Sequence, residues 1–325
     1  MSSRRPKAMP SPLQSSFEVR VPASSANLGA GFDCLGLALK LYLNVRAKVL
    51  SQPSASTVVQ SRGVPGSLDL PSAPDQNLIL RAMRHVAEHE GFDLPPVRLD
   101  VKNDIPIAAG LGSSAAAIAA GVALSFALGG RKVSLDSALR YAAEMEGHAD
   151  NVAAAFLGGL VVTLIRADGS VAAIRKRWPK NLRVIAVTPL LALETFASRS
   201  ALPKTVGHAD AVHNLQRSAL LVAALEQRRY ELLWDAMQDR LHQSYRQALI
   251  PGLADILAMP RASGLAGVAL SGSGPTAIAL ATAHFQQIGK AISDRFKMNG
   301  LASTVRILSV AQEGLAATSK RSHLK

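Results

Sequence analysis

Residues 106–121 read PIAAGLGSSAAAIAAG, a glycine- and serine-containing loop that runs directly into an alanine-rich segment. Gly110 and Gly112 allow the backbone to turn sharply because neither carries a Cβ atom. Ser113 and Ser114 stand where the N-cap of a helix is expected, and the alanines that follow favour a helix. The unpaired N–H groups and the dipole at such a helix start predict a seat for phosphate.

The loop matches neither of two widespread phosphate-binding patterns. It lacks the Gly-Lys-Ser/Thr ending of a Walker A loop and the G-x-G-x-x-G of a dinucleotide fold. Taken alone, GLGSS is therefore open to a second interpretation, a tight turn before a core helix.

Length and composition predict a globular chain of two domains, or of one large domain, since there are 325 residues. Aromatic residues make up only 4% of the chain, so Ala, Leu and Val must fill the core. No uncharged apolar run reaches the roughly 18 residues of a membrane span. The single cysteine, Cys34, excludes an internal disulfide and indicates a reducing, cytoplasmic compartment. A small buried hydrophobe is the simpler interpretation of Cys34 itself.

The formal net charge of +13 has two sources. Six of these charges lie in acid-free ends of the chain, at Arg4, Arg5, Lys7, Lys320, Arg321 and Lys325. A further basic cluster surrounds Trp178, between residues 175 and 183. Nucleic-acid binding would require a basic stripe with interleaved aromatic residues or a known module, and the sequence contains neither. A basic surface that favours anionic substrates is the simpler interpretation. Residues 1–16 predict a disordered basic tail, and they lack the apolar core of a secretory signal.

Hydrophobic periodicity predicts two different halves that meet near residue 180. In the first half it predicts strands over 17–24, 37–50, 97–102 and 159–166, and helices over 76–92, 134–146 and 151–157. A glycine-rich functional loop is expected between the first two strands. In the second half it predicts a strand over 182–189, two helices within 207–249, strands over 266–271 and 276–281, a helix over 284–297 and a strand over 303–310. That order is typical of a split βαβ sandwich.

Four segments, in register, resemble the GHMP small-molecule kinases, which are named after galactokinase, homoserine kinase, mevalonate kinase and phosphomevalonate kinase. They are VPASSANLGAGFDCLGLAL (21–39), PIAAGLGSSAAA (106–117), HADNVAAAFLGGLV (148–161) and LSGSGPT (270–276). The first and third, together with 194–203, 210–225 and 239–253, resemble the homoserine kinase branch of that family. The resemblance covers residues 17–312.

The resemblance implies an α+β, two-domain GHMP kinase fold. A ribosomal-protein-S5-like ATP-binding domain would span residues 17–180, and a ferredoxin-like split βαβ sandwich would span 181–313. Residues 314–325 would then form a second basic tail. The implied activity is ATP-dependent phosphorylation of the side-chain hydroxyl of L-homoserine, a step toward threonine.

The resemblance also assigns the nucleotide and metal residues. Ser114 and Glu146 would hold Mg²⁺, which prefers oxygen ligands and keeps several waters. Glu144 lies two residues before Glu146 on the same predicted helix, so it should face elsewhere. The residues expected to bind ATP are Pro106, Ile107, Ala108, Ala109, Gly110, Leu111, Gly112, Ser113, Ser114, Ala115 and Ala116.

For the acceptor, a buried carboxylate calls for a bidentate guanidinium. Arg199 and Arg246 stand at the matching positions of the homoserine kinases, and Asp33 is the natural partner of a substrate ammonium group. The remaining residues that match the acceptor pocket are Asn27, His148, Asp150 and Gly274.

Asn151 and Thr195 are the residues expected at the reacting hydroxyl. Several GHMP relatives have an aspartate base where this chain has Asn151, and an amide cannot accept the proton. We therefore expect direct attack by the hydroxyl, oriented by Asn151, with the proton lost to phosphate or solvent. Asp150 is adjacent and is expected to point elsewhere. Thr195 could bond the substrate or Asn151, although a hydroxyl that starts a helix is a competing interpretation.

Three other functions stay open at this point. One is a GHMP kinase for a hydroxy acid such as mevalonate, and another is a non-catalytic GHMP-fold binding protein. The third is a basic nucleic-acid binder. The favoured interpretation expects ATP, Mg²⁺ and a small-molecule acceptor, with no nucleic-acid or membrane partner, and it leaves room for a homodimer.

Overall fold

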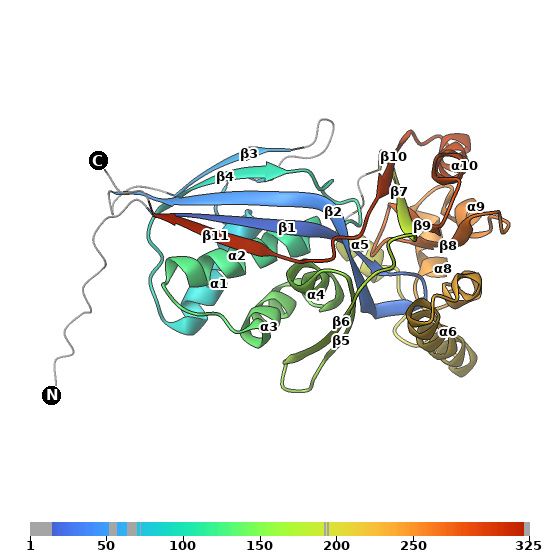
Figure 1. Cartoon of the computed structure of the whole chain (residues 1–325), viewed down its shortest axis with the longest axis horizontal. Coiled ribbons are helices and arrows are strands. Elements are labelled where there is room, and N and C mark those ends of the chain that lie inside the picture. The colour runs from blue at the N-terminus through green and yellow to red at the C-terminus, as the bar shows by residue number, and fades with distance from the viewer. Residues whose placement is uncertain are drawn as a thin grey trace.

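The computed structural model of the chain describes residues 15–51, 57–63, 70–71, 73–191, 193 and 195–321. These residues form one seven-stranded and one four-stranded sheet, which lie in two successive lobes (Figure 1). The chain passes from the first sheet to the second between β6 (Val171–Lys176) and β7 (Arg183–Pro189). This is the region near residue 180 where the sequence predicts the change of domain.

The first sheet is built on a long hairpin of β1 (Ser15–Asn27) and β2 (Gly31–Val49). Its strand order is β11-β1-β2-β4-β3, and β5 and β6 branch from the end of β2. All neighbouring pairs are antiparallel except β3 with β4. The remaining strands are β3 (Val58–Arg62), β4 (Val97–Asn103), β5 (Leu160–Ile165) and β11 (Ala316–Arg321).

Helices α1 to α4 pack on one face of this sheet (Figure 1). α2 lies against α1, α3, α4 and the first two strands, and its first five alanines are buried because small side chains let neighbours approach closely. Asn77 caps α1 and Ser134 caps α3 through their side chains. The bounds are α1 (Leu78–Glu90), α2 (Ser113–Leu128), α3 (Leu135–Glu146) and α4 (Asp150–Leu157).

The second sheet has the order β10-β7-β9-β8, and all its pairs are antiparallel. α10 packs against β7, β9 and β10, while α9 packs on α10 and β8. The succession of strands and helices confirms the predicted α+β fold. The elements are α5 (Thr195–Ser200), α6 (His208–Glu226), α9 (Leu253–Leu257), β8 (Leu265–Leu270), β9 (Ala277–Ala281), α10 (Phe285–Met298) and β10 (Ser303–Leu308).

Two predicted elements are wrong in extent. The expected glycine-rich loop after residue 24 is mostly strand, because β1 and β2 stay paired as far as Asn27 and Gly31 and leave only a tight turn. Residues 207–249 are not two helices: after α6 the chain forms only short turns. Asp239 stops a longer helix because its carboxylate accepts the backbone N–H groups of residues 241, 242 and 243. The short elements are η1 (Tyr230–Leu232), α7 (Leu233–Ala236), α8 (Gln243–Arg246) and η2 (Gln247–Leu249).

The predicted tails also differ from the structure. Residues Ala316–Arg321 form β11 and extend the first sheet beside β1, so half of the expected basic tail 314–325 is a strand. The alternation of apolar and polar side chains that would indicate a strand is not visible in AATSKR, because the segment contains only small residues and charges. β1 already begins at Ser15, and residues 1–14 of the expected N-terminal tail lie outside the described residues.

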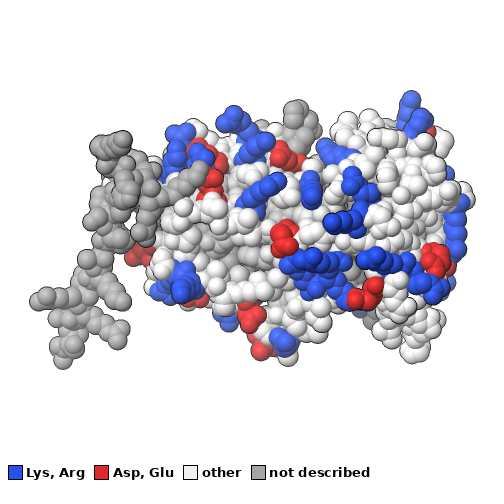
Figure 2. Space-filling model, viewed as in Figure 1, with Lys and Arg blue, Asp and Glu red and all other residues white. Residues whose placement is uncertain are grey.

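The basic residues are distributed over both lobes on the face shown in Figure 2, with acidic residues among them. In the cluster near Trp178, Arg175 pairs with Glu313 at 2.9 Å and Lys176 pairs with Glu226. Trp178 itself is buried, and its indole N–H donates to a backbone carbonyl. Across the described ranges, every helix is too short or too polar to cross a membrane.

Candidate active site

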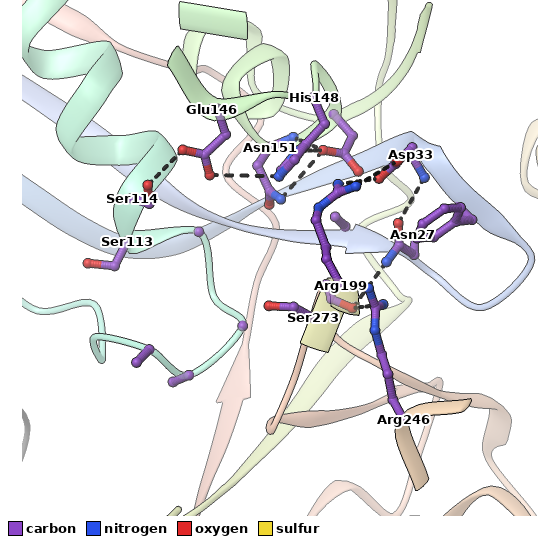
Figure 3. A pocket seen from close by; sticks show the side chains of 18 residues that line it. Asn27, Asp33, Ser113, Ser114, Glu146, His148, Asn151, Arg199, Arg246 and Ser273 are labelled. Atoms are coloured by element: carbon purple, nitrogen blue, oxygen red, sulfur yellow. Dashed lines mark hydrogen bonds and ion pairs between the residues drawn. The ribbon is translucent and has the colours of Figure 1, made fainter. Parts of the chain in front are cut away.

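A cleft with an empty volume of about 600 Å³ lies where the two lobes meet. In Figure 3, Ser114 and Glu146 lie at one end of the cleft, Asp33, Arg199 and Arg246 at the other, and His148 and Asn151 between them. The lining residues are Ala26, Asn27, Phe32, Asp33, Ala108, Ala109, Gly110, Gly112, Ser113, Ser114, Glu146, His148, Asp150, Asn151, Arg199, Arg246, Gly272 and Ser273.

The glycine loop takes a conformation that needs its glycines. Gly110 and Gly112 have φ angles of 74° and 68°, in the left-handed region. A Cβ atom on Gly112 would lie 2.0 Å from Oγ of Ser24, and one on Gly110 would lie 2.4 Å from the carbonyl oxygen of Ser271. The loop is therefore wedged between the first strand and the second lobe, with no room for a larger residue.

The prediction that serines cap α2 is wrong. Gly112 is the N-cap and makes no side-chain capping bond, so Ser113 and Ser114 are already helical. The left-handed turn at Gly112 closes the loop against Ser24 and leaves both hydroxyls free of the capping role. Six loop residues line the cleft, from Ala108 to Ser114 without Leu111. Leu111, Ala115 and Ala116 are buried in the core instead, and Pro106 and Ile107 also lie outside the lining.

Ser114 and Glu146 form a hydroxyl–carboxylate pair in the cleft. Oγ of Ser114 donates to Oε2 of Glu146 at 2.6 Å. Burial raises the pKa of Glu146, although the charge of His148 and the hydrogen bond from Ser114 oppose the rise. Glu144 faces away from the cleft, as helix geometry predicts, and its Oε2 lies 3.2 Å from Nε2 of His85.

His148 and Asp150 form a buried pair beside Glu146. Nδ1 of His148 donates to Oδ1 of Asp150 at 2.7 Å, and the same oxygen accepts the backbone N–H of Asn151 at 2.7 Å. Burial disfavours the charged imidazole, but the hydrogen bond and charge of Asp150 and the charge of Glu146 outweigh burial, so the pKa of His148 is raised. Asp150 lines the cleft, in line with its place among the expected acceptor-pocket residues, and its carboxylate is turned to His148 and the backbone of Asn151. Its position at the start of α4 aims it at His148.

Asn151 is oriented by a residue that sequence reasoning missed. The fully buried hydroxyl of Ser24 donates to Oδ1 of Asn151 at 2.7 Å. Because Oδ1 accepts this bond and the amide nitrogen lies 3.5 Å from Oδ1 of Asp150, the second N–H of that nitrogen is the group left to face a ligand. The only signal for Ser24 was its place in the VPASSAN segment. Thr195 starts α5, and its side chain lies outside the described residues.

At the opposite end, Asp33 and Arg199 form a two-pronged ion pair. Nη2 of Arg199 donates to Oδ1 of Asp33 at 2.8 Å, and Nη1 donates to Oδ2 at 3.3 Å. Asp33 has a left-handed φ of 53°, and its backbone N–H donates to Oδ1 of Asn27 at 3.0 Å. Asn27 in turn donates to the carbonyl of Gly272 at 3.1 Å, which links the hairpin tip to the second lobe.

Arg246 is buried at this end, with an exposed fraction of 1%. Its Nε donates to the carbonyl of Ser198 at 3.2 Å, and its Nη1 donates to the carbonyl of Gly272 at 3.1 Å and to Nδ1 of His242 at 3.0 Å. Burial, and then the nearby charge of Arg199, lower the pKa of Arg246 to about 10. Within the described residues Nη2 makes no hydrogen bond, so this residue offers one nitrogen rather than the expected fork.

Gly274 stands one residue outside the lining that Gly272 and Ser273 provide. Its carbonyl lies behind Gly110, where a Cβ atom on Gly110 would come within 2.7 Å. The hydroxyl of Ser271 donates to the carbonyl of Gly110 at 2.6 Å. The SGSG segment therefore fastens the phosphate loop to the second lobe.

Comparisons with known proteins point to one family. Residues 77–159 match "GHMP kinases N terminal domain", and residues 221–297 match "GHMP kinases C terminal". A protein named homoserine kinase from Desulfitobacterium hafniense is 42% identical over 300 residues, which cover 92% of this chain and 98% of that relative. Another, from Solibacter usitatus, is 40% identical over 305 residues, covering 93% and 97%. The crystal structure of homoserine kinase from Cytophaga hutchinsonii matches with a TM-score of 0.80 at 29% identity, covering 97% of this chain and all of that one.

Proposed function

We propose that this chain, which belongs to the GHMP kinase family, transfers the γ-phosphoryl group of ATP to the side-chain hydroxyl of L-homoserine. The products are O-phospho-L-homoserine and ADP. The proposal is supported by the relatives named homoserine kinase, which match nearly the whole chain. The observation that carries it is the ion pair between Asp33 and Arg199 at the end of the cleft opposite the phosphate loop.

This ion pair offers one negative and one positive charge, which complement the ammonium group and the carboxylate of an amino acid. A substrate ammonium group would replace Arg199 at Asp33, and a substrate carboxylate would replace Asp33 at Arg199. Each protein charge therefore exchanges one partner for another, and neither is left unpaired. The free Nη2 of Arg246 adds a further donor for the carboxylate.

The same reasoning disfavours a hydroxy acid such as mevalonate. Its carboxylate could pair with Arg199, but it has no ammonium group for Asp33. Binding would separate Asp33 from its guanidinium partner without compensation, which costs binding free energy. A non-catalytic binding protein is disfavoured by the intact loop, hydroxyl and carboxylate at the other end of the cleft.

Ser114 and Glu146 fit a Mg²⁺ ion beside the triphosphate. Adjacent oxygen ligands of an octahedral ion with bonds of about 2.1 Å lie about 3.0 Å apart, and these two side-chain oxygens, which are 2.6 Å apart, need to separate only slightly to share one ion. Ser114 and Glu146 would hold the ion, and its positive charge would offset the negative charge that develops on the phosphoryl group. The loop amides of residues 110–114 and the start of α2 would hold the phosphates.

Asn151 orients the acceptor hydroxyl for direct attack. The new bond joins the hydroxyl oxygen to the γ-phosphorus while the bond from phosphorus to the bridging oxygen breaks, and the proton leaves to a phosphoryl oxygen or solvent. An amide cannot take that proton, and Asp150 uses one oxygen on His148 and the backbone of Asn151. Positioning and electrostatic stabilisation therefore do most of the catalytic work.

An ADP-release assay with a panel of acceptors tests the proposal. Homoserine, serine, threonine and mevalonate are compared with a reaction that lacks an acceptor. We expect the highest kcat/KM for homoserine and no acceptor-dependent ADP release with mevalonate. Mevalonate turnover equal to or above that of homoserine would contradict the proposal, as would ADP release that does not depend on any acceptor.

The role of Asn151 has its own test, in a comparison of Asn151→Asp with Asn151→Ala. If Asn151 orients the hydroxyl, the alanine variant retains slow turnover and the aspartate variant gains no rate. Faster turnover in Asn151→Asp, with an activity profile shifted to lower pH and no activity in Asn151→Ala, would argue for a base at this position.

A homodimer and a cytoplasmic location stay predictions from the sequence.

A further inference from the structure

Away from the cleft, His85, His89 and Glu144 bring three metal-ligating side chains together. Their candidate ligand atoms all lie within 4.8 Å of one another, and no other such group occurs in the described part of the chain. The two histidines are four residues apart and share one face of α1. Glu144 approaches from α3, which packs against α1.

The hydrogen bonds of His89 leave one nitrogen available to a metal. Nδ1 of His89 lies 2.7 Å from the backbone carbonyl oxygen of His85. A carbonyl oxygen only accepts, so Nδ1 carries the proton and the neutral ring has its lone pair on Nε2. Metal-ligating histidines are commonly oriented by such a bond from their other ring nitrogen.

The other two ligand atoms form a hydrogen bond that a metal ion would replace. Nε2 of His85 donates its proton to Oε2 of Glu144 at 3.2 Å, and the ion would take the place of that proton. In a tetrahedral zinc site with bonds of about 2.0–2.1 Å, neighbouring ligand atoms are about 3.3 Å apart. Arg140 lies near the other carboxylate oxygen, 3.9 Å from Oε1, so Oε2 stays directed at the histidines.

Tyr141 forms a wall behind the two imidazoles. Its ring centroid lies 5.8 Å from that of His85 and 5.7 Å from that of His89, and its hydroxyl donates to Glu90 at 2.8 Å. The side of the cluster opposite Tyr141 is open to solvent, since the side chains of His85 and Glu144 are 26% and 39% exposed. The three ligands are thus supported from the protein side and reachable from solvent.

We propose that His85, His89 and Glu144 bind a divalent transition-metal ion of the Zn²⁺ class, which links α1 to α3. Two imidazole nitrogens and one carboxylate oxygen are a ligand set that Zn²⁺ takes with water in the fourth position. Mg²⁺ prefers oxygen ligands and octahedral geometry, so it does not compete effectively here. The linked helix α3 is the one that carries Glu146 into the cleft.

Zn²⁺ titration of the whole protein tests this proposal, with a competing fluorescent chelator as the readout and excess Mg²⁺ to occupy oxygen-rich sites. We expect the unmodified protein to bind one equivalent of Zn²⁺ tightly. The affinity for this equivalent should be at least tenfold weaker in His89→Gln and in Glu144→Gln. The matched control is His208→Gln, which removes an exposed histidine at the start of α6 and should keep the equivalent. Glu146→Gln should also keep it, because that residue lies in the cleft.

Thermal unfolding supplies a second readout that separates binding from misfolding. Zn²⁺ should raise the Tm of the unmodified protein and of His208→Gln but not that of His89→Gln or Glu144→Gln. All variants should share the same Tm without added metal. Retention of the equivalent in His89→Gln and Glu144→Gln would overturn the proposal, as would its loss in Glu146→Gln or its absence from the unmodified protein.

Discussion

The two ends of the cleft are constructed in different ways. The phosphate end is almost continuous in sequence, since one loop and the first turn of α2 supply it and only Glu146 comes from elsewhere. The acceptor end brings together Asp33 from the β1–β2 hairpin, Arg199 from α5 and Arg246 from α8. Its charged groups come from both lobes.

The difference separates general recognition from specific recognition. Backbone N–H groups and a helix dipole suit any polyphosphate, and they need only glycines that let the chain approach. A zwitterion with a hydroxyl must instead be matched by fixed charges of both signs. Mutations at the acceptor end should therefore change which substrate is used, whereas mutations at the phosphate end should change how nucleotide and metal are used.

Arg246→Leu should have the largest effect and should separate the two ends most clearly. We expect the KM for homoserine to rise about 100-fold or more, because losing one partner of a buried, hydrogen-bonded charge costs 2–5 kcal/mol or more. The KM for ATP should change by less than about twofold, since Arg246 is at the far end of the cleft. Steady-state kinetics with each substrate varied measures both.

Arg240→Leu is the matched control for that change. Arg240 precedes α8 in the chain, is 55% exposed and pairs with Asp210 on the surface at 3.2 Å, so both KM values should stay near those of the unmodified protein. If Arg246→Leu raised the KM for ATP as much as the KM for homoserine, this arginine would support the whole cleft rather than the acceptor end.

Asp33→Asn should have a smaller effect, because the Asp33–Arg199 pair is partly exposed and solvent screens it. The KM for homoserine should rise about 10- to 100-fold. Discrimination against a hydroxy acid should also weaken, since the amide no longer demands an ammonium group. The ratio of kcat/KM for homoserine and mevalonate measures this, and an unchanged ratio would remove Asp33 from the role of ammonium partner.

Ser114→Ala probes the phosphate end. Loss of a group that holds a metal or its ligand typically costs 10- to 100-fold in affinity, so we expect the Mg²⁺ dependence of turnover to shift about tenfold while the KM for homoserine stays constant. The hydrogen bond from Ser114 lowers the pKa of Glu146, so its removal raises that pKa further. Activity should then begin to fall at a higher pH on the acidic side, and unchanged kinetics would exclude Ser114 from the site.

The sequence reveals the phosphate end more fully than the acceptor end for a physical reason. Glycines, serines and a helix-forming run are local signals, and they predict α2 and its loop even though the capping residue is Gly112 rather than a serine. Helix periodicity predicts that Glu144 and Glu146 face different directions, and the family resemblance then selects Glu146 for the cleft.

The acceptor end depends on pairings that no local pattern encodes. Family resemblance pointed to Asp33 and Arg199, but only the folded chain shows that they neutralise each other. Arg246 was expected as a fork, and its three internal hydrogen bonds leave a single nitrogen free. Likewise β11 became visible only through its pairing with β1, at the other end of the chain.

Ser24→Ala should have the smallest effect and act where the two ends meet. Its hydroxyl touches Oδ1 of Asn151, so its removal loosens the amide without removing a contact to either substrate. A hydrogen bond of about 0.5–1.5 kcal/mol corresponds to a kcat reduced roughly 2- to 10-fold, with both KM values unchanged.

Ser25→Ala is the matched control, because that hydroxyl bonds Ser271 instead. If Ser24 acts only through Asn151, Ser24→Ala combined with Asn151→Ala should be no slower than Asn151→Ala alone. Additive losses would mean that Ser24 supports the cleft by another route, the packing of its side chain against Gly112.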